Sequence, residues 1–378
     1  MKKYTRFLTT LLAAALLVVA ALPSAFAFTY TPVAGTSTTF DKYLVMDADA
    51  NVPNATFAFT VAPGTAIAAT ENRVAVLAGI GTPTIANVTF APTDSTTAGL
   101  PSDTDTATAG QKYAKQTVTV SFSGISFPEP GIYRYIVTET ATTDQGVTND
   151  KSATRTLDVY VTDNDGALEV SSYVLHTGTD APAAGDDKGS AGVALGDKSS
   201  GYTNTYDTSN LTFSKTVSGN QASRDKYFAF TVTIRGAVAG TVYDVDLTKA
   251  DVNISANPND ATTCIGNAVT QPQRLTVPAD GTVNQVFYLQ HGQEITIKGL
   301  AKDTVYSVTE NAEDYKSSNP NGITGTIASD DVTAAFTNTR SGVIPTGVLL
   351  TVAPFATIMA VGAVGIIVMV GKKRKRAE

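Results

Sequence analysis

FAFTV at residues 57–61 and its copy at 228–232 are the segments from which the architecture of this chain follows. Three further pairs of similar segments occur in the same order, namely FDK (40–42) with FSK (213–215), YIVTE (135–139) with YSVTE (306–310), and YTNTY (202–206) with FTNTR (336–340). Their offsets are 171 to 173 residues for the first three landmarks and 134 for the last. Repetition over such a distance indicates two related structural units, of which the first has a longer stretch before its final segment.

The repeated segments have the two-residue periodicity of β-strands. Polar and apolar residues alternate between turns rich in Gly, Asp, Asn and Pro, as in KQTVTVSFSGISF (115–127), IYRYIVTE (132–139), TRTLDVYVT (154–162) and GQEITIKGL (292–300). Such alternation places one face of a strand in a core. The sequence therefore predicts an all-β chain of short strands, folded as sandwiches or barrels.

The two units meet near residues 206–211, which form a short polar joint. We therefore predict one domain over residues 28–207 and a second over 208–341. Because a short connection leaves little freedom between domains, we expect a fairly stiff rod.

The N-terminus has the pattern of a secretory signal. Residues 1–27 begin with basic side chains, continue with an apolar run at 11–22 and end in Ala25-Phe26-Ala27, which predicts cleavage after residue 27. An uncleaved membrane anchor is the alternative, but the apolar run is short for a span.

The C-terminus predicts retention at a membrane. Residues 348–370 carry no charge, and as a helix they would be roughly 35 Å long, enough to cross a bilayer. The basic tail at 371–378 would stay in the cytoplasm. An ordinary tail anchor is one interpretation. VIPTG at 343–347, directly before the span, instead favours a segment that is removed by cleavage.

Composition excludes several functions. Removing the eight basic residues and one acidic residue of the two ends from the chain's 27 and 34 leaves 19 against 33, a net charge of −14 for residues 28–346. Such a surface argues against nucleic acid as a partner. The single Cys264 cannot form an internal disulfide, and His176 and His291 are far apart, so we expect no metal site and no cofactor.

Each unit repeats one ordered trio of polar residues: Lys42, Glu139 and Asn204, then Lys215, Glu310 and Asn338. In both units Lys lies on the first expected strand, Glu on an interior strand and Asn on the last. These residue types are poor strand formers in a core, yet apolar or aromatic residues flank each of them. A single such residue is ordinarily a solvated one, and Asn in TNT could begin a turn; two ordered trios in one chain argue against that.

The two ends, the repeated all-β units and the trios together resemble the streptococcal major pilin family with isopeptide-linked Ig-like domains. The resemblance covers essentially the whole chain and implies two tandem Ig-like (CnaB-type) β-sandwich domains. In that family a Lys side chain is joined covalently to an Asn side chain with the help of a buried Glu. The resemblance implies the following roles here: Lys42 bonded to Asn204 with Glu139 assisting, and Lys215 bonded to Asn338 with Glu310 assisting.

The physical chemistry suits these residue types. Only a neutral amine is nucleophilic, and burial lowers the pKa of Lys while raising that of Glu. We expect the neutral Glu to donate a hydrogen bond to the Asn carbonyl oxygen and then to shuttle a proton to the departing ammonia. Folding holds the Lys amine next to the Asn amide and so supplies the effective concentration that a reaction between separate molecules lacks. Each bond forms once, so the chain is not a turnover enzyme.

The C-terminal pattern resembles a sortase sorting signal, with VIPTG in the place of the common LPxTG. Val343 and Ile344 occupy the Leu and Pro positions, while Thr346 and Gly347 match. The resemblance implies cleavage between Thr346 and Gly347 and transfer of the Thr346 carboxyl to a Lys of the next subunit. Family acceptors lie shortly before the bonded Asn, which favours Lys198, with Lys188 as the second choice. An ordinary solvated loop lysine is the alternative for either.

The leading hypothesis is a shaft subunit of a covalent pilus on a Gram-positive surface. Its expected partners are pilus and housekeeping sortases, other copies of itself, minor pilins, peptidoglycan and a host surface. The second hypothesis is a wall-anchored adhesin that never polymerises and needs no acceptor Lys. An exported enzyme is the third, for which the sequence offers no catalytic constellation beyond the trios.

Overall fold

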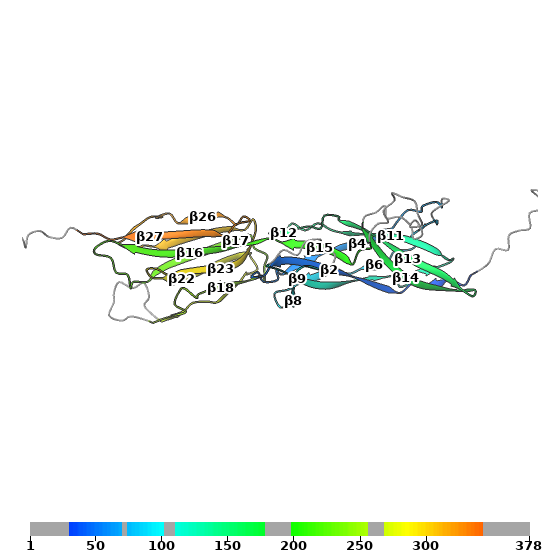
Figure 1. Ribbon diagram of the computed structural model, residues 1–378, viewed down its shortest axis with the longest axis horizontal. Coiled ribbons are helices and arrows are strands. Elements are labelled where there is room, and N and C mark those ends of the chain that lie inside the picture. Colours follow the sequence, from blue (N-terminus) through cyan, green and yellow to red (C-terminus); the bar gives the residue numbers. More distant parts are fainter. Residues whose placement is uncertain (1–29, 70–73, 102–109, 178–197, 256–267, 343–378) are drawn as a thin grey trace, which may run out of the picture.

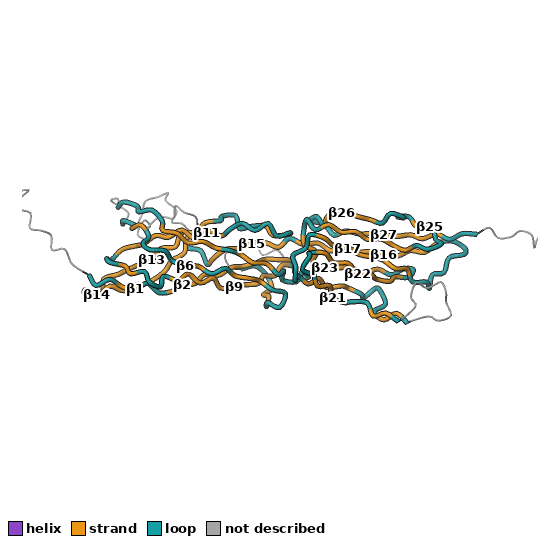
Figure 2. The backbone as a smooth tube through the Cα atoms, turned by 180° about the vertical axis from the view of Figure 1, so that it is seen from behind, coloured by secondary structure: helices purple, strands orange, loops and turns teal. Residues whose placement is uncertain are grey.

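The protein is an elongated molecule built of β-strands. The computed structural model describes residues 30–69, 74–101, 110–177, 198–255 and 268–342. These residues form two β-sandwiches placed end to end (Figure 1), and the opposite view shows strands running along the long axis in both halves (Figure 2). The prediction of an all-β chain with two tandem sandwich domains is confirmed.

Several predicted features lie outside the described residues. They are the signal peptide (1–27), the VIPTG motif (343–347), the apolar span (348–370) and the basic tail (371–378). None of the described segments forms a helix with the length and apolarity that a bilayer crossing requires.

The first domain packs two main sheets face to face. Among its described residues, one sheet has the order β12-β15-β2-β9-β6, with β8 also on β9: β12 (Val147–Thr148), β15 (Gly201–Tyr206), β2 (Ser37–Asp47), β9 (Gln111–Ser121), β6 (Thr84–Ile85) and β8 (Thr96–Ala98). The other has the order β14-β13-β11-β4, with β5 also on β11: β14 (Ala167–Thr177), β13 (Thr154–Asn164), β11 (Gly131–Glu139), β4 (Phe59–Pro63) and β5 (Leu77–Ala78). Two short pairs complete it: β1 (Val33–Ala34) with β10 (Ser126–Phe127), and β3 (Ala55–Phe57) with β7 (Val88–Phe90).

The second domain repeats the plan. Its described strands form one sheet of order β21-β18-β23-β16-β27-β25: β21 (Arg274–Thr276), β18 (Val242–Asp246), β23 (Glu294–Ala301), β16 (Thr208–Ser218), β27 (Val332–Thr339) and β25 (Lys316–Ser317). The facing sheet has the order β22-β17-β24-β26: β22 (Thr282–Leu289), β17 (Phe228–Arg235), β24 (Val305–Asn311) and β26 (Ile323–Thr326). A short pair, β19 (Asn253–Ile254) with β20 (Val269–Thr270), lies apart from both sheets.

Each sandwich has its own aromatic core. In the first, Phe122 packs edge-on against Tyr135 with ring centroids 5.0 Å apart, and both residues are fully buried. In the second, Phe230 packs edge-on against Phe336 at 5.3 Å. The FAFTV copies supply part of this packing, because Phe59 and Phe230 both point inward from the strand that borders β11 or β24. Aromatic side chains each bury about 150–250 Å² and dominate such cores.

The domains are joined tightly. Only Asp207 separates β15 from β16, and its backbone N–H and C=O bond to Gly146 O (2.7 Å) and Lys302 N (2.9 Å). Gly299 has φ +68°, and a Cβ there would lie 2.8 Å from Ala50 Cα of the other domain. Glycine thus permits both the left-handed backbone and the close approach.

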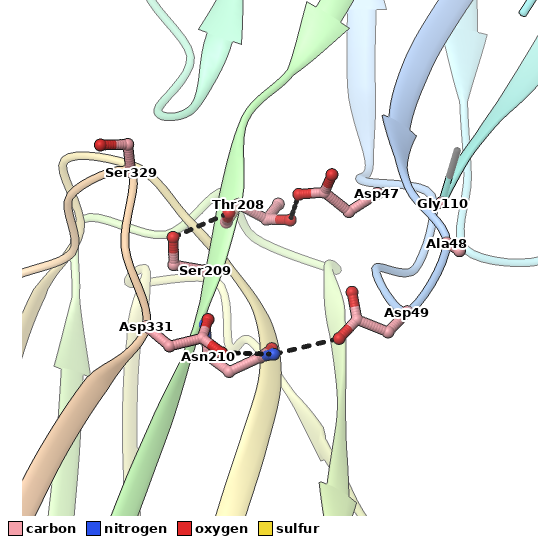
Figure 3. A pocket seen from close by; sticks show the side chains of 9 residues that line it. All are labelled: Asp47, Ala48, Asp49, Gly110, Thr208, Ser209, Asn210, Ser329 and Asp331. Atoms are coloured by element: carbon pink, nitrogen blue, oxygen red, sulfur yellow. Dashed lines mark hydrogen bonds between the residues drawn. The ribbon is translucent and has the colours of Figure 1, made fainter. Parts of the chain in front are cut away.

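Polar side chains also cross the joint, around a hollow that Figure 3 shows from close by. Thr208 donates a hydrogen bond to Asp47 Oδ2 at 3.1 Å, and Asn210 Nδ2 donates to Asp49 Oδ2 at 3.0 Å. These contacts support the expectation of a stiff connection between the two domains.

Candidate functional site

The sheet topology brings the predicted Lys and Asn residues onto one face of two neighbouring strands. In the first domain β2 and β15 pair in parallel, with Lys42 opposite Tyr202 and Leu44 opposite Asn204. Residues two apart on a strand share a face, so Lys42 and Asn204 both point between the sheets. In the second domain β16 and β27 repeat this register, with Lys215 opposite Phe336 and Val217 opposite Asn338.

The predicted Glu of the first domain reaches this pair from the opposite sheet. Glu139 ends β11, an interior strand between β13 and β4. Its Oε1 lies 2.6 Å from Lys42 Nζ and accepts a hydrogen bond from Asn204 Nδ2 at 3.1 Å. One carboxylate oxygen therefore contacts both residues that the predicted bond would join.

The second domain has the same arrangement. Glu310 lies on β24, an interior strand between β17 and β26. Its Oε1 accepts hydrogen bonds from Lys215 Nζ and, at 3.0 Å, from Asn338 Nδ2. The structure thus assembles both trios that the sequence analysis selected, each between the two sheets of its own domain.

Both clusters are removed from water, and this changes their acid–base properties. Lys42, Asn204 and Asn338 have no exposed surface, and Lys215 is 1% exposed. Burial lowers the pKa of Lys42 and of Lys215 to about 8, against the opposing effect of the nearby Glu139 or Glu310 carboxylate. Burial raises the pKa of Glu139, which Lys42 opposes. In the first domain these two directions lower the cost of moving a proton from the Lys42 amine to the Glu139 carboxylate.

The orientation of the two Asn side-chain amides differs from what we expected. Both Glu side chains face the Asn amide nitrogen, whereas we expected them to face the carbonyl oxygen. A carboxyl group in this position is suited to protonating the nitrogen that must leave. In the first domain the carbonyl oxygen of Asn204 instead accepts a hydrogen bond from the backbone N–H of Asp150 at 2.8 Å.

Each buried lysine also lies over an aromatic ring that the sequence analysis did not assign to the site. Lys42 Nζ is 4.5 Å from the centroid of Phe57, and Lys215 Nζ is 4.2 Å from that of Phe228. These are the first residues of the two FAFTV copies. The repeat was therefore a signal for the site as well as for the fold, because the ring closes off one side of the amine.

A further buried lysine provides a comparison within the same molecule. Lys226 is 2% exposed, contacts Glu313 and lies 5.7 Å from the centroid of Phe228. Lys226 Nζ donates a hydrogen bond to Glu313 Oε2. Lys226 thus combines a buried amine, a carboxylate and an aromatic ring, but it belongs to neither Lys–Glu–Asn trio.

The residues predicted to join subunits are only partly described. Lys198 is exposed, six residues before Asn204, and its backbone forms an isolated antiparallel bridge with His176 at the end of β14. Lys188, Thr346 and Gly347 lie outside the described residues.

Comparison with known proteins relates the chain to pilins. Residues 39–207 match the family model described as a Spy0128-like isopeptide containing domain, and residues 209–340 match a domain of unknown function. A pilin of Streptococcus pyogenes serotype M1 is 29% identical over 369 residues, covering 91% of this chain and 92% of that protein.

Solved structures show the same fold. The crystal structure of the major pilin from Streptococcus pyogenes matches with a TM-score of 0.52 at 21% identity, over 82% of this chain and 100% of that one. The major pilin protein T3.2 from Streptococcus pyogenes serotype GAS13637 matches with a TM-score of 0.50 at 20% identity, over 82% and 99%. The first domain thus matches an isopeptide-containing domain, and the chain is similar to a pilin along nearly its whole length.

Proposed function

We propose that this chain is the repeating shaft subunit of a sortase-assembled covalent pilus, stabilised within each domain by one Lys–Asn isopeptide bond. The observation that carries the proposal is the similarity to a pilin over 91% of the chain, a stretch long enough to extend over both domains. A pilin acts as a structural protein, so its performance depends on stability under load and not on turnover.

The buried clusters support one bond per domain. A neutral Lys42 Nζ attacks Asn204 Cγ, Glu139 gives its proton to Nδ2 and takes one from Nζ, and ammonia leaves. One C–N bond forms and one breaks, and the carboxyl group ends as it began. The same sequence of steps in the second domain joins Lys215 to Asn338 with Glu310 as the shuttle.

The position of these bonds suits a fibre under tension. Each joins the first long strand of a domain to its last strand, and these two strands pair in parallel. Parallel neighbours pulled from opposite ends slide past each other, and a covalent tie across them blocks that motion. Unlike a disulfide, the tie is indifferent to reducing conditions, which agrees with a chain that has one cysteine.

Polymerisation is proposed to run from Thr346 of one subunit to Lys198 of the next. The exposed position of Lys198, close in sequence to Asn204, supports this choice over a buried lysine. Tension entering at Lys198 would pass directly into β15 and hence to the proposed bond. After cleavage at Thr346 the subunit would leave its transient membrane anchor for the pilus or the cell wall.

The test is polymerisation in a Gram-positive cell that carries the matching pilus sortase. Lys198→Arg should abolish the ladder of high-mass species on denaturing gels, whereas the matched variant Lys188→Arg should keep it. Loss of the ladder with Lys188→Arg alone would move the acceptor to that residue. A wild-type chain that stays monomeric on the wall with the sortase present would favour the non-polymerised adhesin.

A further inference from the structure

The two candidate sites differ in what faces the asparagine carbonyl oxygen. In the first domain the backbone N–H of Asp150 donates to Asn204 Oδ1 at 2.8 Å. An N–H can only donate, so the atom it faces is the oxygen, and the amide nitrogen is directed to Glu139. In the second domain Asn338 Oδ1 is buried and has no hydrogen-bond partner among the described residues.

The Asp150 side chain holds this N–H in place. Its carboxylate accepts hydrogen bonds from Ser152 N at 2.9 Å and from Thr203 N, the residue before Asn204, at 2.7 Å. Arg155 binds both carboxylate oxygens, at 3.2 and 3.0 Å. The two charged side chains are each 8% exposed. The connection after β12 is therefore tied to the strand that carries the reacting asparagine.

Arg155, on β13, is itself held by β15 of the opposite sheet. Its guanidinium lies 4.5 Å from the ring centroid of Tyr202, and its Nε lies 3.3 Å from Gly201 O. Both residues precede Asn204 on β15. The geometry of Asp150 against Asn204 thus depends on contacts with the three residues directly before the reacting one, and the N–H is oriented before any reaction begins.

The corresponding connection of the second domain uses its N–H differently. Ser318 Oγ accepts a hydrogen bond from Thr337 N at 3.0 Å, just as the Asp150 carboxylate accepts from the residue before Asn204. The Ser318 N–H, however, donates to Thr337 O at 2.8 Å. The side-chain tie is kept, but the donor to the asparagine oxygen is not.

We propose that the Asp150 N–H is an oxyanion donor for isopeptide formation in the first domain, with the Asp150 carboxylate and Arg155 as its positioning groups. This inference rests on the proposed Lys42–Asn204 bond. When Nζ attacks Cγ, negative charge develops on Oδ1, the atom that this N–H already contacts. A preoriented donor at a developing oxyanion typically contributes about 10²–10³ in rate.

The test removes the N–H and leaves the side chain. Cell-free synthesis of residues 28–346 with the hydroxy-acid analogue of Asp in place of Asp150 turns that amide into an ester. Samples quenched over time are digested, and the joined peptides of the two domains are quantified by mass. The ester should slow formation of the Lys42–Asn204 bond by about 10²-fold, while the Lys215–Asn338 bond of the same molecules keeps its wild-type rate.

The matched control places the hydroxy-acid analogue of Ser at 318, where the N–H does not face the asparagine oxygen. It should leave the Lys215–Asn338 rate within a few-fold of wild type. A purely structural role of Asp150 is tested in the Lys42→Met variant, in which the first bond cannot form. The melting temperature of that variant with and without the ester gives the effect of the ester on stability alone.

The outcomes are distinct. A wild-type rate of the first bond with the ester at Asp150, or a slowing that the ester at Ser318 reproduces in the second domain, overturns the oxyanion donor. Absence of the Lys42–Asn204 peptide from the unmodified chain overturns the proposed bond itself. Asp150→Asn, which keeps the N–H but weakens the tie to Arg155, should slow the first bond by less than the ester does.

Discussion

Replacing Lys42 by Met should remove the first-domain cross-link while leaving the site filled with an unbranched apolar side chain. The proposed cross-link would close a loop between positions that are 162 apart in the sequence (204 − 42). Treated as a constraint on the unfolded chain, such a loop stabilises the domain by about 5 kcal/mol. For a domain of this size each kcal/mol corresponds to about 2–4 °C in Tm, so the first-domain transition should fall by about 10–20 °C.

The assay is differential scanning calorimetry of residues 28–346, with the intact mass as a check on the bond. Lys226→Met is the matched control, because that lysine is also buried against a carboxylate and an aromatic ring but belongs to neither Lys–Glu–Asn trio. It should leave the mass deficit unchanged and shift Tm by no more than a few degrees. A Lys42→Met protein that melts within a few degrees of wild type would refute the reasoning.

Glu139→Ala and Glu310→Ala should each restore the mass of one ammonia and leave the bond of the other domain intact, as read by peptide mapping. Asn204→Ala leaves the first-domain lysine free and buried with its pKa lowered to about 8, so the unfolded state binds more protons above that pH. Its free energy of unfolding should therefore rise by up to about 2 kcal/mol from pH 8 to 9.5, and a flat profile in denaturant titrations would contradict this. Gly299→Ala should destabilise the joint by at least about 1 kcal/mol in guanidinium unfolding, and by more than Gly236→Ala, which has a similar φ of +81° but open space around its Cβ.

Much of the architecture could be predicted from the sequence because similar segments occur in the same order in both domains. The alternation in 132–139 and 154–162 corresponds to β11 and β13, and the paired landmarks locate equivalent strands in both domains. The trios could be selected for the same reason. A polar residue that recurs at equivalent places on apolar strands is improbable as a surface residue, so two copies carried information that one would not.

The remaining features depend on contacts between segments that no local pattern specifies. Asp150 reaches Asn204 only because β12 pairs with β15 in a particular register. The orientation of the Asn204 amide follows from that contact, and so could not be inferred from residue types. Lys226 also lies beside a carboxylate and an aromatic ring, and its pairing with Glu313 is a contact that the sequence pattern does not specify.

The central claim is that each domain closes itself covalently through a buried lysine. Intact-mass spectrometry of the purified and unfolded segment 28–346 tests this claim most directly. The account predicts a mass below that of the summed residues by two molecules of ammonia. A mass equal to the sum of the residues would contradict it.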